Sequence, residues 1–209
     1  MKITEWIGLL GVFSGILAFT AGLLQYMRAQ KWKRAEFIAK EFKEFKSFPA
    51  VSNAMLMLDW NSRDFIIHKP NDYGLDNQTN TGVNSKENDT EINDIVLANA
   101  LVHHNQKHLS FSPERRITGF TTKEAFVRDT FDAFFEGLQI FEQFIQSGLI
   151  SAAEFKPYLI YWIEIIANDN NISKPEWCRK NIWHYIDAYD YKSVQRLCFR
   201  YGYDISPRA

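Results

Sequence analysis

The most strongly apolar part of the chain lies at its N-terminus. From Trp6 to Met27 the sequence reads WIGLLGVFSGILAFTAGLLQYM and holds no charged residue. As a helix, this stretch would be about 33 Å long, which matches a hydrocarbon core of roughly 30 Å. A cleaved signal peptide is the alternative, but its apolar region would be shorter, and no A-x-A motif precedes a cleavage point here. We therefore predict a single uncleaved transmembrane anchor over residues 1–27.

Small residues repeat within this segment at alternating intervals of three and four. They form one seam made of Gly8, Gly11, Gly15, Ala18 and Gly22, and Gln25 continues it. Helices in lipid associate mainly by close backbone approach over small side chains, and a repeat of 3.5 residues favours a left-handed crossing. Glycine is also simply frequent in membrane helices, which is the alternative. We expect the seam to mediate self-association, with Gln25 as an interhelical hydrogen-bonding group.

Basic residues follow the apolar segment directly. The preceding flank offers only Lys2 and the chain's amino group against Glu5, whereas the following residues include Arg28, Lys31, Lys33 and Arg34. By the positive-inside rule, the N-terminus lies outside and the remainder in the cytoplasm, at the inner membrane. These cations are expected to contact lipid headgroups. A regulatory lipid switch is one hypothesis for them, and a topology signal on an ordinary solvated helix face is the favoured one.

The rest of the chain follows helical periods. Residues 28–48 form a basic juxtamembrane helix without Pro or Gly, and residues 49–209 form a cytoplasmic domain. A short helix follows Pro49, another is expected over 91–107, and the helix with residues 155–167 should be central to the core because it is apolar on nearly all sides. Helix ends are predicted from three capping boxes and three further signals. The boxes are Thr121 with Glu124, Ser151 with Glu154 and Ser173 with Glu176, and the further signals are a cap at Asp190 and stops before Gly148 and at Gly202.

Two segments depart from the helical pattern. Residues 64–68 read as a brief strand or one more turn. Residues 70–90 are rich in Asn, Asp, Thr, Ser and Gly, and we expect a flexible insertion because they offer little apolar surface to bury. Apart from residues 64–68 no alternation typical of strands is present, so the predicted fold class is all-α, with a single transmembrane helix continuing into a helical bundle.

Composition excludes several classes of protein. The 24 basic and 25 acidic residues leave a net charge of −1, so no nucleic-acid partner is expected. Two cysteines, Cys178 and Cys198, are too few for a disulfide framework or a cysteine-rich zinc site. Walker-type loops, G-x-G-x-x-G and G-x-S-x-G motifs are absent from the sequence. We expect no cofactor.

Three groups of polar residues are candidates for chemistry. His103, His104 and His108 could bind a metal, although a polar helix end is the favoured interpretation. Glu164 is surrounded by apolar residues, and we expect it to be buried and paired with an arginine. The third group is a stripe of acids beside Arg128, of which Asp132 is expected to pair with that arginine at i, i+4; the stripe consists of Asp129, Asp132 and Glu136.

The stretch FFEGLQIFEQFIQSGLIS, followed by YLIYWIEII, together with Arg128 and Asp132, resembles the DUF4760-like family of uncharacterised single-pass bacterial membrane proteins. The resemblance implies a membrane helix with a basic exit and a helical cytoplasmic domain, and some such proteins lie beside stress or phage-defence genes. We therefore expect a membrane-anchored, homo-oligomeric interaction, sensor or effector module without catalytic activity, with a protein partner. The alternatives are a metal-dependent hydrolase using the histidines and a membrane-permeabilising defence effector.

Overall fold

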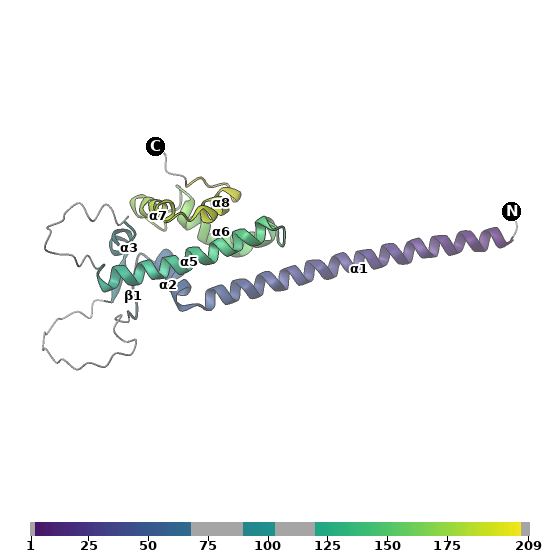
Figure 1. Ribbon diagram of the computed structural model, residues 1–209, viewed down its shortest axis with the longest axis horizontal. Helices are drawn as coiled ribbons and strands as arrows, with labels where there is room; N and C mark the ends of the chain where they lie inside the picture. Colours follow the sequence, from purple (N-terminus) through teal and green to yellow (C-terminus); the bar gives the residue numbers. More distant parts are fainter. Residues whose placement is uncertain (1–2, 68–89, 103–119, 206–209) are drawn as a thin grey trace. The chain divides into compact units, whose positions relative to one another are not determined.

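The computed structural model describes residues 3–67, 90–102 and 120–205, with side chains from residue 11 onward. Within these residues the protein is mostly helical, which confirms the predicted all-α class. The helices are α1 (Ile3–Ser47), α2 (Pro49–Asp59), α3 (Asp94–Ala100), α5 (Thr122–Gln146), α6 (Ala152–Ala167), α7 (Glu176–Ala188) and α8 (Lys192–Arg200), and two short strands are β1 (Ser62–Asp64) and β2 (Glu91–Asn93) (Figure 1).

The chain divides into two compact units, residues 1–43 and 44–209. The first unit holds α1 up to Lys43, and the last residues of this helix belong to the second unit. The helix continues without a break to Ser47 because no proline interrupts it before Pro49. Phe48 is extended, and Pro49 then opens α2 at the first helical position, where its missing N–H costs nothing. Among the residues that the structure describes, no helix offers a stretch long and apolar enough to cross a membrane.

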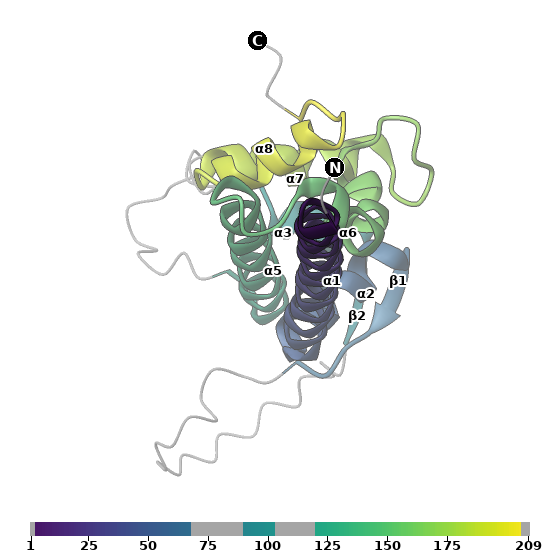
Figure 2. The same cartoon turned by 90° about the vertical axis from the view of Figure 1, so that its right-hand side faces the viewer.

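The centre of the second unit is α5, which contacts α2, α3 and α8 (Figures 1 and 2). Its apolar seam is fully buried and rich in aromatic rings, among them Phe131, Phe134 and Phe135. The prediction that α6 is the central helix was wrong. Helix α6 leaves Tyr161 49% exposed, because it has neighbours on only part of its surface.

Gly137 allows a close approach within the second unit. A Cβ at this position would lie 2.2 Å from Cε2 of Phe45, well inside van der Waals contact. The Phe45 ring instead packs against Phe134 and Phe141, with ring centroids 5.7 and 5.0 Å away. The glycine in the motif FFEGLQIF is therefore a packing requirement of the aromatic core.

The strands correct two predicted boundaries. β1 pairs antiparallel with β2, so that Arg63 lies opposite Ile92. The strand thus lies at 62–64 and ends where 64–68 was expected to begin, and residues 91–93 are a strand where a helix was expected. The helix starts only at Asp94, because the Asn93 side chain accepts hydrogen bonds from the backbone N–H groups of Ile95 and Val96. The predicted helix end, like most of the 70–90 insertion, lies outside the described residues.

Two of the three capping boxes form. Thr121 and Ser151 each accept from the N–H three residues on, and the glutamates Glu124 and Glu154 complete the boxes. The third was wrong, because Pro175 occupies the N-cap position of α7 and no side chain caps it. Asp190 does not cap α8 either; it takes a positive φ of 59° in the connecting turn. Gly148 and Gly202 follow α5 and α8 with positive φ, as predicted.

Candidate functional site

The described part of α1 exposes an unusual amount of apolar surface. Every side chain from residue 11 to residue 29 is exposed. The large ones include Phe13 at 58%, Leu17 at 68% and Phe19 at 71% exposure. Singly exposed apolar side chains are ordinary, whereas a contiguous set marks a surface for protein or membrane contact.

The seam residues lie open on this helix. A Cβ added at Gly11, Gly15 or Gly22 would meet no atom within 4 Å. Ala18 and Gln25 are also exposed. Gly8 precedes residue 11, the first residue whose exposure the structure describes. Unlike Gly137, the three described seam glycines serve no close approach within the chain. Each therefore weakens the helix by up to about 1 kcal/mol relative to alanine without a visible intramolecular gain.

The basic residues after the apolar segment are exposed as well. Arg28, Lys31, Lys33 and Arg34 lie on α1 with Trp32 among them, and Trp32 is 79% exposed. An indole ring has both an apolar body and a polar N–H, so it is well suited to a boundary between water and an apolar phase.

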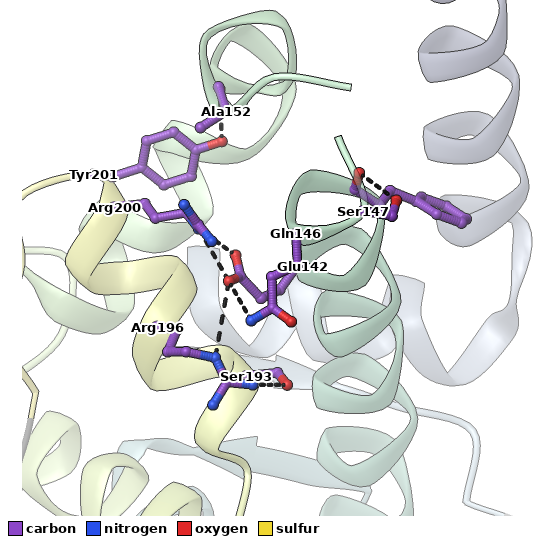
Figure 3. A network of polar contacts seen from close by, with 9 residues as sticks. Glu142, Gln146, Ser147, Ala152, Ser193, Arg196, Arg200 and Tyr201 are labelled. Atoms are coloured by element: carbon purple, nitrogen blue, oxygen red, sulfur yellow. Dashed lines mark hydrogen bonds and ion pairs between the residues drawn. The ribbon is translucent and has the colours of Figure 1, made fainter. Parts of the chain in front are cut away.

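The second unit holds a fully buried carboxylate, Glu142 of α5 (Figure 3). Arg200 Nε of α8 donates to both of its oxygens, at 2.9 and 2.8 Å. Gln146 donates to the same carboxylate at 3.1 Å, and Arg196 Nε lies 3.9 Å from it. Glu142 was not predicted from the sequence, although Phe135, Leu138 and Glu142 share one helical stripe at intervals of three and four.

Glu164 does not have the predicted arginine partner. It is half-buried and accepts a hydrogen bond from the Tyr203 hydroxyl at 3.2 Å. The glutamate–arginine pair expected in α6 is found instead between α5 and α8. Burial of Glu164 was predicted from its apolar neighbours along the sequence. The prediction was wrong because other helices cover only part of the surface of α6.

Arg128 and Asp132 diverge although they are four residues apart on α5. Arg128 donates to the Ala100 carbonyl at 2.8 Å, and its guanidinium lies 4.9 Å from the Tyr185 ring centroid. Asp132 instead accepts from the hydroxyls of Tyr185 at 2.6 Å and Tyr191 at 2.8 Å. The predicted intrahelical ion pair is therefore wrong, because these partners from α3, α7 and the α7–α8 turn hold both side chains.

A second buried cation ties the strand region to α3 and α7. Lys174 is 1% exposed, and its Nζ lies 2.6 Å from the Trp60 carbonyl oxygen and 2.6 Å from Asp94 Oδ1. The neighbouring Arg179 donates to the backbone carbonyls of Asp169, Asn171 and Lys174. Both cations hold the segment before α7 in place.

The remaining candidate residues do not converge. Asp129 lines a groove of about 520 Å³ between α2, β1 and α5, away from the tyrosines that bind Asp132, and Glu136 is exposed. The structure forms no cluster of three metal-ligating side chains within its described residues. The metal candidates His103, His104 and His108 lie outside them.

Burial controls the titration of several groups in the second unit. It raises the pKa of the Cys178 and Cys198 thiols to about 12, and both cysteines are free. Burial, with a smaller effect of Glu142, raises the pKa of Tyr201 to about 12. Burial and the hydrogen bond to Asp132 raise the pKa of Tyr185 and Tyr191. These cysteines are protonated at neutral pH and are poor nucleophiles.

No family model, no curated protein and no solved structure matches this chain. The resemblance to DUF4760-like proteins therefore stays a prediction from the sequence.

Proposed function

We propose that this chain is a single-pass, self-associating membrane protein of the inner membrane whose helical domain lies in the cytoplasm and receives a partner or signal, without catalysis. The observation that carries the proposal is the exposure of the apolar side chains of α1. Water is a poor environment for such a surface, and lipid tails are a favourable one.

The length of the apolar segment supports a complete crossing. The uncharged stretch starts at Trp6, five residues before the first side chain that the structure describes. As a helix, the whole stretch from Trp6 to Met27 would be about 33 Å long, which matches the roughly 30 Å thickness of a hydrocarbon core. The exposed cations that follow support a cytoplasmic position for the second unit, because cytoplasmic flanks of membrane helices are enriched in Lys and Arg.

The buried charged side chains of the second unit support a role without catalysis. Its buried charged side chains are used within the domain: Glu142 pairs with Arg200, and Lys174 pairs with Asp94. Arg128 is held by backbone carbonyls and aromatic rings. Such pairing makes the domain rigid and specific in structure, and it leaves these groups engaged rather than free for proton transfer.

Membrane extraction of the full chain tests the anchor. We expect the protein to remain in the membrane pellet after alkaline carbonate treatment. The double variant Ile16→Lys/Leu17→Lys should move to the supernatant, because two charges at the centre of the span cost roughly 5 kcal/mol or more. Leu149→Lys is the matched control, since Leu149 is 49% exposed in the second unit and its replacement should leave the protein in the pellet.

Orientation is read from a single exposed cysteine. Gln143 is exposed on α5, whereas Cys178 and Cys198 are buried, so Gln143→Cys provides a selective label. A membrane-impermeant maleimide should label it in inside-out vesicles and not in intact spheroplasts. Release of the unmodified chain by carbonate, or labelling in intact spheroplasts, would overturn the anchor or its orientation respectively.

A further inference from the structure

We infer that residues 28–34 form a collar around α1 that binds the headgroups of anionic phospholipids, with Trp32 at the level of the membrane interface. This inference rests on the proposed function, because it requires α1 to leave the bilayer at this point. It adds the chemical class of lipid and a residue, Trp32, to the simple anchor.

The charge of the juxtamembrane helix is concentrated in this short segment. The sequence RAQKWKR contains four cations and no acid. Residues 35–47 contain three lysines and three glutamates, so their formal charge sums to zero. The whole positive excess thus lies within seven residues, a length of about 10 Å, comparable to the headgroup layer.

The cations surround the helix instead of forming one stripe. At roughly 100° per residue, Arg28, Lys31, Lys33 and Arg34 are distributed around the whole circumference. Trp32 falls in the widest arc between them, the one between Arg28 and Lys33. A helix lying along a membrane surface would need its cations on one side, whereas a helix that crosses the interface meets headgroups on every side.

The exposure of these side chains fits lipid contact. Arg28, Lys31 and Lys33 are exposed, and Trp32 is 79% exposed, the largest exposure of any tryptophan among the large exposed hydrophobic residues. Lys and Arg donate to phosphate oxygens, and the indole N–H donates to ester or phosphate oxygens while its ring lies near the first methylenes. Anionic lipids add the Coulomb attraction that zwitterionic lipids lack.

Energy transfer in vesicles tests the lipid class on the full chain. Ala35→Cys places a donor dye at an exposed position beside the collar, and the two native cysteines are fully buried. Vesicles contain trace acceptor-labelled phosphatidylglycerol or phosphatidylcholine in a mixed bilayer. We expect transfer to phosphatidylglycerol to exceed transfer to phosphatidylcholine, and 0.5 M KCl to reduce the excess because salt screens exposed charges.

Matched variants locate the effect. Lys31→Gln/Lys33→Gln halves the charge of the collar, so the excess transfer should fall by at least about half. Lys40→Gln/Lys43→Gln removes the same charge about 14 Å farther along the helix, beyond a Debye length, and should leave the excess unchanged. The tryptophan emission that is lost in Trp32→Phe reports on Trp32. We expect lipid brominated near the headgroup to quench this emission more strongly than lipid brominated near the chain ends.

The outcomes separate the two proposals. If the unmodified chain fails to float with vesicles, both the anchor and the collar are overturned. If it floats but transfers equally to both lipids, or if the two lysine pairs have the same effect, the collar is overturned and the anchor stands. If shallow bromine fails to quench the Trp32 component, the placement of Trp32 at the interface is overturned.

Discussion

Glu142 and Glu164 show how the same side chain takes different roles according to what covers its helix. Glu142 is fully buried between α5 and α8 and accepts from Arg200, whereas Glu164 is half-buried and accepts from Tyr203. A carboxylate without exposure to water must be compensated by donors, and a partly exposed one retains water on one side. The arginine is therefore found at Glu142.

Loss of Arg200 should destabilise the second unit. Arg200→Ala leaves the buried Glu142 carboxylate with Gln146 and the more distant Arg196. We expect the free energy of unfolding to fall by about 2 kcal/mol. Breaking a fully buried ion pair costs roughly 3–5 kcal/mol, and the loss should be smaller here because the Arg200 guanidinium is partly exposed. Denaturant titration followed by tryptophan fluorescence measures it.

The matched control for Arg200 is Lys192→Ala on the same helix. Its ion pair with Asp190 is 2.8 Å long, but both side chains are exposed, at 69% and 74%. Exposed pairs contribute little, so this variant should leave the free energy of unfolding almost unchanged. Equal effects of the two substitutions would show that the buried carboxylate does not depend on Arg200.

At the scale of helices and strands, a capping motif in the sequence formed a cap only where its serine or threonine has the backbone conformation of an N-cap. Ser151 is extended before α6, and its hydroxyl accepts from the Glu154 N–H at 3.3 Å. Ser173 has the same S-x-x-E spacing, but its own N–H donates to the Asn171 side chain at 2.8 Å. The turn closed by Asn171 and the buried Lys174 moves the helix start to Glu176.

This difference gives a prediction for two serines in the same motif. Ser151→Ala should destabilise the second unit by about 1 kcal/mol, because the N–H groups of the first turn of α6 lose an acceptor. Ser173→Ala should have an effect below about 0.5 kcal/mol, because its side chain caps nothing. Thermal unfolding by circular dichroism compares them, and an equal loss would mean that the third box forms in solution.

The seam of α1 makes a second prediction at this scale. Gly11→Leu/Gly15→Leu should weaken self-association in detergent by about tenfold or more, since bulky side chains keep helix backbones apart and interhelical contacts contribute roughly 1–2 kcal/mol. Phe13→Leu/Leu17→Phe, on the bulky side of the helix, is the control that should leave assembly intact. Sedimentation equilibrium measures both, and unchanged assembly of the glycine variant would refute the seam.

For the whole molecule, burial predicts an alkaline limit to stability. The pKa of the Cys178 and Cys198 thiols rises from 9.0 to about 12 on folding, and that of Tyr201 rises from 10.0 to about 12. The folded protein therefore holds protons that the unfolded chain releases. The stability from these groups is fully present below about pH 9 and is lost as pH rises toward 12.

Denaturant titrations between pH 7 and 11 check this limit. Each thiol should contribute a slope of about −1.4 kcal/mol per pH unit above pH 9. Cys198→Ala removes one titrating group and should reduce the slope by that amount, although cavity formation lowers its stability at pH 7. A pH-independent free energy of unfolding above pH 9 would contradict the buried thiols.

The sequence by itself determined the features that depend on neighbouring residues along the chain. These include the long uninterrupted helix, the helical class, the buried seam of α5, two capping boxes and the glycine stops. They could be predicted because helix periodicity and end signals act over a few residues. The apolar stretch and its basic flank, the basis of the candidate membrane site, belong to the same kind of information.

Only the tertiary structure decided which residues meet across the chain. Arg200 reaches Glu142 across 58 positions, Lys174 reaches Asp94 across 80, and Phe45 lies against Gly137. The strand at 91–93 exists because residues 62–64 lie beside it. Such contacts depend on how the helices pack against one another. The residues next to a polar side chain in the sequence do not determine which distant helix will cover it.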